Sequence, residues 1–541
     1  MQFFFILLVS IAVSILVIRV MVRYAPRLGL IDMPDARKVH SIPISCVGGI
    51  GIVLGALVPI IIWLPMSNGI VAYLLGSLVL FVLGVIDDAV ELGHYKKFAG
   101  QVIAVLIMIF YGDVYVTRLP FFSGEIDPLF GIPFTLFAMI GVINALNHSD
   151  GLDGLAGGES LLSFVVIAYL AFVVKGYELV AVAAAGIGGV LGFLRVNTYP
   201  AQVFMGDSGS QFLGFTLGYL VISLVTDVHT ALSPALPLLL FGLPVIDIVA
   251  VLIIRASHGM NWFRATRNHI HHRLLDLNFD HYESVVIIYS MQALFVVSAI
   301  LLRYQSDGLI VSLYFMVCAI IFVLLIMGER AGWQIHRGHP ASGLTRFVVS
   351  VKQHRLFTYL PLTFITVAVP LYIITGSFWV DSVPRDFAVI SGVLFIILNL
   401  ELIFGKNESS MIIRGIAYSV SIFIVYLMTQ DPLLDSNVNR TINIIYFSSM
   451  AVALAIVIRY ESTTPFKTTT MDYLVIFVIL VISIMPKAFL IEYNLTVLVI
   501  KSAILLYGYE VLISRNVMRL SVINISVALS LAVLSVRGLL L

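Results

Sequence analysis

Apolar windows of about 20 residues recur along the whole chain, separated by short polar connections. A helix of this length crosses the hydrocarbon core of a bilayer, which is about 30 Å thick. The pattern therefore predicts an all-α, polytopic membrane protein. The first run has no basic segment before it and no small-residue cleavage site after it, so we expect it to be retained as a span. About eleven spans are expected before residue 330, near 3-22, 47-66, 70-86, 99-116, 130-146, 158-174, 178-195, 209-226, 233-254, 284-303 and 308-327.

A basic loop from Gly328 to Leu356 interrupts this pattern, and we place a domain boundary there. It separates a membrane-embedded domain, residues 1-330, from an additional hydrophobic multi-span region, residues 331-541. No internal repeat relates the two parts, which disfavours a transporter built from inverted repeats. The second part has no clustered carboxylates and about seven expected spans, near 357-376, 387-404, 410-428, 443-458, 471-490, 495-511 and 519-537.

The composition agrees with this class: 60% of residues are hydrophobic and only 11% are charged. The net charge of +1 gives no field that would attract nucleic acid. The two cysteines, Cys46 and Cys318, lie far apart without the spacing of a metal site, so we expect neither a disulfide nor a cysteine-bound metal.

Five of the expected connections fall on one side of the membrane, and that side carries most of the basic residues of the first part. By the positive-inside tendency, we expect this side to be cytoplasmic and the N-terminus to lie outside. The same connections hold every polar cluster described below. They are 23-46, 87-98, 144-157, 195-208 and 255-283.

Carboxylates gather at the ends of the apolar runs. Asp87 and Asp88 are adjacent, and because like charges raise each other's proton affinity, such a pair suits a general base or a cation ligand. A solvated helix end is the alternative for this pair. Lys97, ten residues on, suits a phosphate or the aspartate pair itself. Asp207 lies between glycines before another span, which suits a hard cation such as Mg²⁺, with a simple helix-capping role as the alternative.

Four polar residues recur at every third position as one span ends, and they are followed by a glycine-rich stretch. On helical turns they form one polar stripe, and the glycines let backbone approach a ligand closely. A helix cap needs only one such residue, so capping alone does not account for four of them. The stripe consists of Asn144, Asn147, Asp150 and Asp153.

Three histidines, His269, His271 and His272, lie among arginines that include Arg267. Zinc prefers histidines with thiolate or carboxylate partners, so the arginines favour a diphosphate or a sugar phosphate instead. A basic loop that contacts anionic lipid is the alternative. Near the N-terminus, Lys38 and His40 precede a pair of glycines, a segment that indicates little by itself.

The stretches DD, NxxNxxDGLDGLA, FMGDSGS and HxHHRL occur together in this order. In this combination, the chain resembles the polyprenyl-phosphate N-acetylhexosamine-1-phosphate transferase superfamily, glycosyltransferase family 4. The HIHHRL form of the last stretch is similar to the WecA/TagO-like branch and differs from the MraY branch, which loads phospho-MurNAc-pentapeptide. The resemblance covers about residues 1 to 330.

The resemblance implies a bundle of about eleven helices that transfers a sugar 1-phosphate, GlcNAc 1-phosphate by default, from a UDP-sugar to a polyprenyl phosphate such as undecaprenyl phosphate, releasing UMP. It implies Mg²⁺, with Mn²⁺ as an alternative. It also implies a multi-pass protein of the inner (plasma) membrane, with a cytoplasmic active site that initiates cell-envelope glycan assembly.

The resemblance also implies roles for individual residues. Asp207 matches the Mg²⁺ ligand, and Asp87 matches the proposed base on the lipid phosphate and lies at the metal. Asp88 and Lys97 match catalytic residues near the lipid phosphate or diphosphate. The other matches are the catalytic Asp150 and Asp153, and the substrate-binding Lys38, His40, Asn144, Asn147, Arg267, His269, His271 and His272.

Two short segments depart from the family pattern: Pro43 is followed by Ser45 where a second proline is common, and His148 and Ser149 replace apolar residues. Both leave loop shape and the choice of sugar undetermined. The region beyond residue 330 lies outside the resemblance, and we expect it to be accessory, with contacts to a second copy or to glycan-assembly enzymes left open.

Two rival functions remain. A membrane transporter or flippase of a lipid-linked or anionic substrate should carry its polar groups near the midplane, whereas those of this chain lie at span ends. A membrane phosphatase or hydrolase would share the cation site but use water as acceptor. UMP formation that depends on polyprenyl phosphate separates the three.

Overall fold

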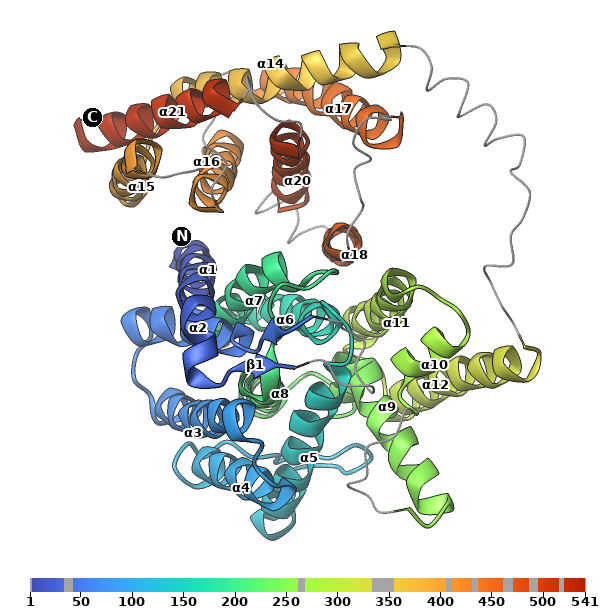
Figure 1. The fold of residues 1–541 in the computed structure, drawn as a ribbon. Helices are drawn as coiled ribbons and strands as arrows, with labels where there is room; N and C mark the ends of the chain where they lie inside the picture. Colours follow the sequence, from blue (N-terminus) through green and yellow to red (C-terminus); the bar gives the residue numbers. More distant parts are fainter. Residues whose placement is uncertain are drawn as a thin grey trace. The chain divides into compact units, whose positions relative to one another are not determined.

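The computed structural model describes residues 2–33, 42–260, 268–332, 355–404, 411–430, 436–460, 470–485, 495–514 and 520–540. In these residues, fourteen helices are long and apolar enough to cross a membrane, and three more apolar helices are shorter (Figure 1). The expected all-α, polytopic membrane fold is therefore confirmed. The chain forms two compact units, one of Met1–Arg337 with Thr469–Ile484, and one of Gly338–Thr468 with Met485–Leu541.

The first unit holds every polar cluster expected from the sequence within the described residues. Its elements are α1 (Gln2–Leu28), β1 (Ile31–Asp32), β2 (Ile44–Ser45), α2 (Gly48–Trp63), α3 (Asn68–Val90), α4 (His94–Phe110), α5 (Pro128–Ser149), α6 (Leu155–Val173), α7 (Tyr177–Asn197), α8 (Gly206–Ser223), the π-helix η1 (Leu224–Val228), α9 (Pro237–Ser257), α10 (Ile270–Asp276), α11 (His281–Leu302), α12 (Asp307–Arg330) and α18 (Thr470–Ile484).

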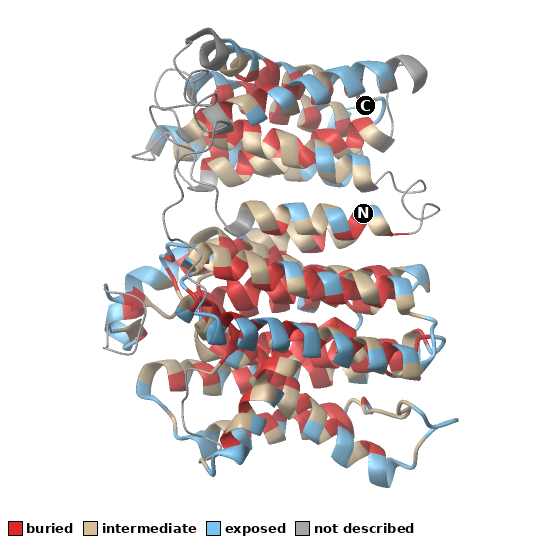
Figure 2. Ribbon diagram, turned by 90° about the vertical axis from the view of Figure 1, so that its right-hand side faces the viewer, coloured by how far each residue is buried: buried red, intermediate tan, exposed pale blue. Residues whose placement is uncertain are grey.

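Helices α6, α7 and α8 form the centre of this unit: 78%, 83% and 89% of their apolar windows are buried, against 28% for α1 and α12. Buried residues gather on the inward helix faces, and exposed ones lie outward (Figure 2). Small residues allow the tight packing. A Cβ atom at Gly188 of α7 would lie 2.6 Å from the backbone oxygen of Leu7, so α1 and α7 pack nearly backbone to backbone.

One short sheet departs from the all-helical pattern. Strand β1 pairs antiparallel with β2, and the N–H of Phe204 donates to the carbonyl of Ser45 over 2.9 Å. The carbonyl of Phe204 accepts in turn from the N–H of Gly48, also over 2.9 Å. These bonds fix the segment that leads into α8.

Helix α18 comes from the second half of the sequence but packs in the first unit, against α11 and α6. Its Tyr473 ring lies edge-on to that of Tyr282, with 5.3 Å between centroids. The structure thus groups one helix from beyond residue 330 with the first unit.

The second unit is a helical bundle in which α14 packs against α17 and α21, and α21 also packs against α15. Arg537 of α21 donates to the carbonyls of Ser377 and Phe378 at the end of α14, both over 3.0 Å. The elements are α14 (Arg355–Trp379), α15 (Arg385–Phe404), α16 (Met411–Gln430), α17 (Ser436–Tyr460), α20 (Leu495–Ser514) and α21 (Leu520–Leu540).

Candidate active site

Three carboxylates from two helices converge where α3 ends and α8 begins. Asp87 and Asp88 lie in the last turn of α3, and Asp207 lies in the first turn of α8. Each offers an oxygen within 4.8 Å of the others. The Nζ atom of Lys97, in the first turns of α4, lies 2.6 Å from Asp87 Oδ2 and 2.8 Å from Asp207 Oδ2. One ammonium group therefore neutralises part of a concentrated negative charge.

Two glycines allow this convergence. A Cβ atom at Gly84 would lie 2.4 Å from Ser208 Cα, so α3 touches the start of α8 directly. Gly206 has a φ of +70°, and a Cβ atom there would lie 2.5 Å from Asp88 Oδ2. A side chain at either position would push the carboxylates apart.

Asp88 caps the N-terminus of α8. Its Oδ1 accepts from the N–H of Asp207 over 2.7 Å, and its Oδ2 accepts from the N–H and the Oγ of Ser208 over 3.2 and 2.9 Å. A helix start leaves its first N–H groups unpaired, and a carboxylate there is also favoured by the helix dipole. Asp88 thereby fixes the position of Asp207.

Asp87 and Asp207 fit a divalent cation. The Oδ1 atom of Asp87 is buried and has no hydrogen-bond partner among the described residues, which is costly for a carboxylate unless a cation fills the site. Asp207 Oδ1 accepts from Asn147 Nδ2 over 3.1 Å, which orients the carboxylate. Hard oxygen donors in small number suit Mg²⁺ that is shared with substrate phosphates. Both oxygens of Asp88 already accept hydrogen bonds from α8.

The amide side chains of the polar stripe support the carboxylates. Asn147 also donates to Ser210 Oγ over 2.8 Å. One turn deeper, Asn144 donates to Gln101 Oε1 over 2.8 Å, and Gln101 donates to Gln211 Oε1 over 3.2 Å. This cluster of amides joins α4, α5 and α8 directly behind the carboxylates.

Asp150 and Asp153 lie in the turn that connects α5 to α6, and they differ in environment. Burial raises the pKa of Asp150 to about 7, helped by the charges of Asp207, Asp153 and Asp88. Asp153 instead holds neighbouring backbone: its Oδ2 accepts from the N–H of Ala201 over 2.9 Å. A bound cation would lower the proton affinity of Asp150 and leave Asp153 as an anchor of the segment before α8.

The histidine motif lies against this turn. His269 stacks with His148, with centroids 5.4 Å apart, and with His271, with centroids 5.6 Å apart. A Cβ atom at Gly151 would lie 2.3 Å from His271 Nε2, so the turn between α5 and α6 packs directly against His271. Burial lowers the pKa of His271, and the neighbouring histidines lower it further, so this imidazole is neutral near pH 7.

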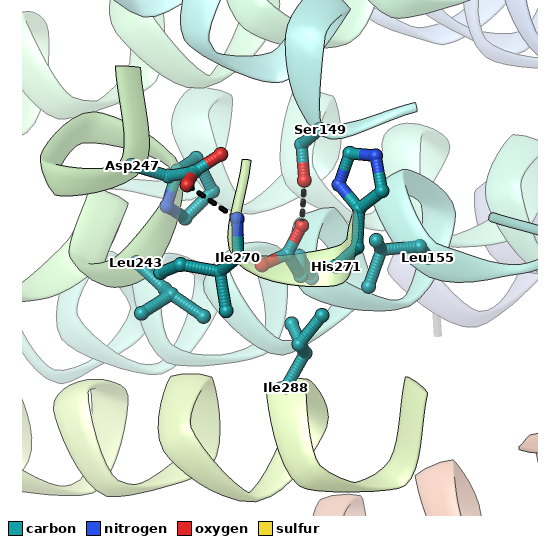
Figure 3. Close-up of a pocket in the computed structure, with 9 residues that line it drawn as sticks. Ser149, Leu155, Leu243, Asp247, Ile270, His271 and Ile288 are labelled. Carbon is teal, nitrogen blue, oxygen red and sulfur yellow. Dashed lines mark hydrogen bonds between the residues drawn. The ribbon is translucent and has the colours of Figure 1, made fainter. Parts of the chain in front are cut away.

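His271 of this motif lines a small pocket (Figure 3). In it, Glu159 of α6 accepts a hydrogen bond from Ser149 Oγ, which ties the end of α5 to α6. Asp247 of α9 accepts from the N–H of Ile270 over 2.8 Å. Two buried carboxylates thus hold the base of the site. The lining residues are Ser149, Leu155, Glu159, Leu243, Pro244, Asp247, Ile270, His271 and Ile288.

Comparison with known proteins matches this arrangement to a family. Residues 70–225 match the model of glycosyl transferase family 4. Over 322 residues, the chain is 30% identical to the probable undecaprenyl-phosphate N-acetylglucosaminyl 1-phosphate transferase of Bacillus subtilis (strain 168), covering 59% of this chain and 89% of that relative. The chain belongs to glycosyl transferase family 4.

Two other family-4 relatives are similar to this chain. One is the undecaprenyl-phosphate alpha-N-acetylglucosaminyl 1-phosphate transferase of Escherichia coli O157:H7, 29% identical over 58% of this chain and 88% of the relative. The other is the decaprenyl-phosphate N-acetylglucosaminephosphotransferase of Mycobacterium tuberculosis (strain CDC 1551 / Oshkosh), 31% identical over 49% and 74%. The family resemblance seen in the motifs is thereby confirmed.

The structure brings most of the predicted site residues of this family-4 chain to one end of the helices. Lys38, His40 and Arg267 lie outside the described residues. The other predicted site residues gather at the ends of α3 and α5, in the turn between α5 and α6, and at the starts of α4, α8 and α10. These residues are Asp87, Asp88, Lys97, Asn144, Asn147, Asp150, Asp153, Asp207, His269, His271 and His272.

The sequence reasoning missed four residues that hold this site together: Gln101, Glu159, Ser208 and Asp247. The sequence contained a signal that could have identified two of these residues. Glu159 and Asp247 are single carboxylates inside apolar runs, where a charge costs about 2.5 to 3.5 kcal/mol and so indicates a role. Gln101 and Ser208 carry no such signal, because neutral polar residues are common near span ends.

Proposed function

We propose that this family-4 protein transfers N-acetylhexosamine 1-phosphate, GlcNAc 1-phosphate by default, from a UDP-sugar to a polyprenyl phosphate such as undecaprenyl phosphate. The products are the polyprenyl-diphosphate sugar and UMP, and the step initiates assembly of a cell-envelope glycan, such as wall polymer or lipopolysaccharide O-antigen. The observation that carries this proposal is the cluster of Asp87, Asp207 and Lys97 beside the stacked histidines, in a chain whose relatives are named for this reaction.

In this reaction, an oxygen of the lipid phosphate attacks the phosphorus that bears the sugar. A new P–O bond forms, the P–O bond to UMP breaks, and UMP leaves with the electron pair. Asp87 takes the proton from the lipid phosphate. Asp87 and Asp207 would hold Mg²⁺, or Mn²⁺, which supplies charge neutralisation on the phosphates.

The other residues position the two substrates. Lys97 lies within reach of both carboxylates and contributes a positive charge for the diphosphate. His271 and His272, with Arg267, Lys38 and His40 from the segments outside the described residues, bind the donor. Phosphoryl transfer asks a protein mainly for in-line positioning and charge neutralisation, which these side chains provide. The excess of basic residues on this side supports a cytoplasmic active site in the inner (plasma) membrane.

The direct test is UMP release by the purified full-length protein with Mg²⁺, undecaprenyl phosphate and a panel of UDP-N-acetyl sugars. We expect release that requires lipid, metal and one preferred donor, and that EDTA abolishes. UMP release without lipid would indicate a hydrolase. Binding of lipid-linked substrate with no release by folded protein would favour the alternative, a transporter or flippase.

His272→Ala should raise the KM for the UDP-sugar about tenfold, with a smaller effect on the KM for undecaprenyl phosphate, because one hydrogen bond to the donor is lost. Steady-state kinetics of UMP release measure both constants. His258→Ala is the matched control, since His258 is an exposed histidine at the end of α9 whose Nδ1 contacts Ser257 and the carbonyl of Ile254. A larger effect on the lipid KM would contradict the donor-side role of His272.

A further inference from the structure

Asp247 lies in α9, yet its carboxylate contacts the start of the histidine motif. Its Oδ2 lies 2.7 Å from Nδ1 of His269, and its Oδ1 accepts from the N–H of Ile270 over 2.8 Å. Asp247 is 8% exposed and His269 is 6% exposed. The carboxylate therefore holds a side chain and the adjacent backbone at the point where α10 begins, and Figure 3 shows its bond to the backbone of Ile270.

We propose that Asp247 is a positioning residue, which fixes the orientation and the proton of His269 for the transfer reaction. This inference rests on the proposed function. An ionised carboxylate accepts hydrogen bonds only, so the nitrogen that faces it must carry the proton. Nδ1 of His269 is then the protonated nitrogen, and Nε2, on the far side of the ring, is the atom presented to a substrate.

Among the described residues, Asp247 is the neighbour that fixes the rotation of the His269 ring. The ring stacks with those of His148 and His271, with centroids 5.4 and 5.6 Å away, but stacking fixes the plane and not the rotation of an imidazole. The hydrogen bond to Asp247 selects one rotation and one tautomer. Because the same carboxylate also accepts from Ile270, the backbone at His269 cannot shift without breaking both bonds.

The placement of Asp247 also argues for a function. Asp247 lies inside an apolar helix, where an ionised carboxylate is costly, and its hydrogen bonds go to two consecutive residues at the start of α10. Similar carboxylate–imidazole pairs hold catalytic and metal-binding histidines in one tautomer. Asp227 of η1, an exposed carboxylate beyond the C-terminal end of α8, serves as the control for loss of a charge outside the site.

The test compares Asp247→Asn, His269→Ala, the double variant and Asp227→Asn in the full-length protein. Asn offers one acceptor for two donors, and its NH₂ group facing Nδ1 would select the other tautomer. We expect Asp247→Asn and His269→Ala each to lower kcat/KM for the UDP-sugar about a hundredfold, with no further loss in the double variant. Asp227→Asn should stay within about threefold of wild type. A double variant whose loss equals the product of the single losses would overturn the proposal, and so would an Asp247→Asn variant of wild-type kcat/KM.

A second measurement keeps the test valid if Asp247→Asn fails to fold. In wild-type protein with ¹⁵N-labelled histidine, the signal that His269→Ala removes should have the shift of an imidazole protonated at Nδ1. A signal protonated at Nε2 alone would overturn the proposal. This spectrum does not depend on turnover, so it separates failure of this inference from failure of the proposed function, which would appear as absent UMP release in wild-type protein.

Discussion

Asp207→Asn should lower UMP release by about a hundredfold or more, while the protein remains folded. The substitution keeps the shape of the side chain but removes a charge that faces Lys97 at 2.8 Å and Asp87 across the cluster. A neutral amide is a weak ligand for a hard cation, so the charge on the substrate phosphates would no longer be neutralised. UMP release across a range of Mg²⁺ concentrations measures the loss.

Metal affinity provides a second readout of the same variant. Binding of Mn²⁺ to purified protein without substrates should weaken at least tenfold in Asp207→Asn, because a charged ligand is lost. Asp227→Asn is the matched control, since Asp227 lies in η1 at the opposite end of the same helix. Rates like those of wild type in Asp207→Asn would mean that the cation site lies elsewhere.

The sequence predicted the convergence of Asp87, Lys97, Asn147 and Asp207 for a physical reason. Each lies at or near an end of an apolar run, and runs that alternate in direction bring alternate ends to the same face. The order of the motifs in the chain then sufficed to identify the family, without knowledge of any contact between helices.

The roles of individual side chains could not be predicted in the same way. The adjacent residues Asp87 and Asp88 are equivalent in sequence, yet one has a buried oxygen with no partner in the described part of the chain and the other caps α8. The difference depends on the angle between α3 and α8, which Gly84 and Gly206 permit. Local pattern does not encode that angle.

Contacts between distant segments were also beyond the sequence reasoning. Asp247 bonds to His269, which lies 22 positions later in the sequence. Tyr473 of α18 contacts Tyr282 of α11, although the 328-356 loop lies between them in the sequence. A boundary drawn from composition separates regions by charge and apolar content. Such a boundary does not predict which unit a single helix joins, and the apolar composition of α18 fits either unit.

Lys97→Met should have opposite effects on metal binding and on turnover. Lys97 occupies the space between Asp87 and Asp207, at 2.6 and 2.8 Å, so its ammonium group competes with a divalent cation for the same oxygens. Without it, the two carboxylates are uncompensated, and Mn²⁺ should bind about tenfold more tightly. Turnover should nevertheless fall about a hundredfold, because the charge that would hold the diphosphate is gone.

The neighbouring Lys96 provides the control for these opposite effects on metal binding and turnover. Lys96 is exposed in the same turn of α4, whereas the ion pairs with Asp87 and Asp207 are made by Lys97, so Lys96→Met should change neither quantity by more than about twofold. Mn²⁺ titration and UMP release on the same preparations distinguish the outcomes. Weaker Mn²⁺ binding in Lys97→Met would mean that the ammonium group holds the carboxylates in place for the cation, and unchanged turnover would remove Lys97 from the reaction.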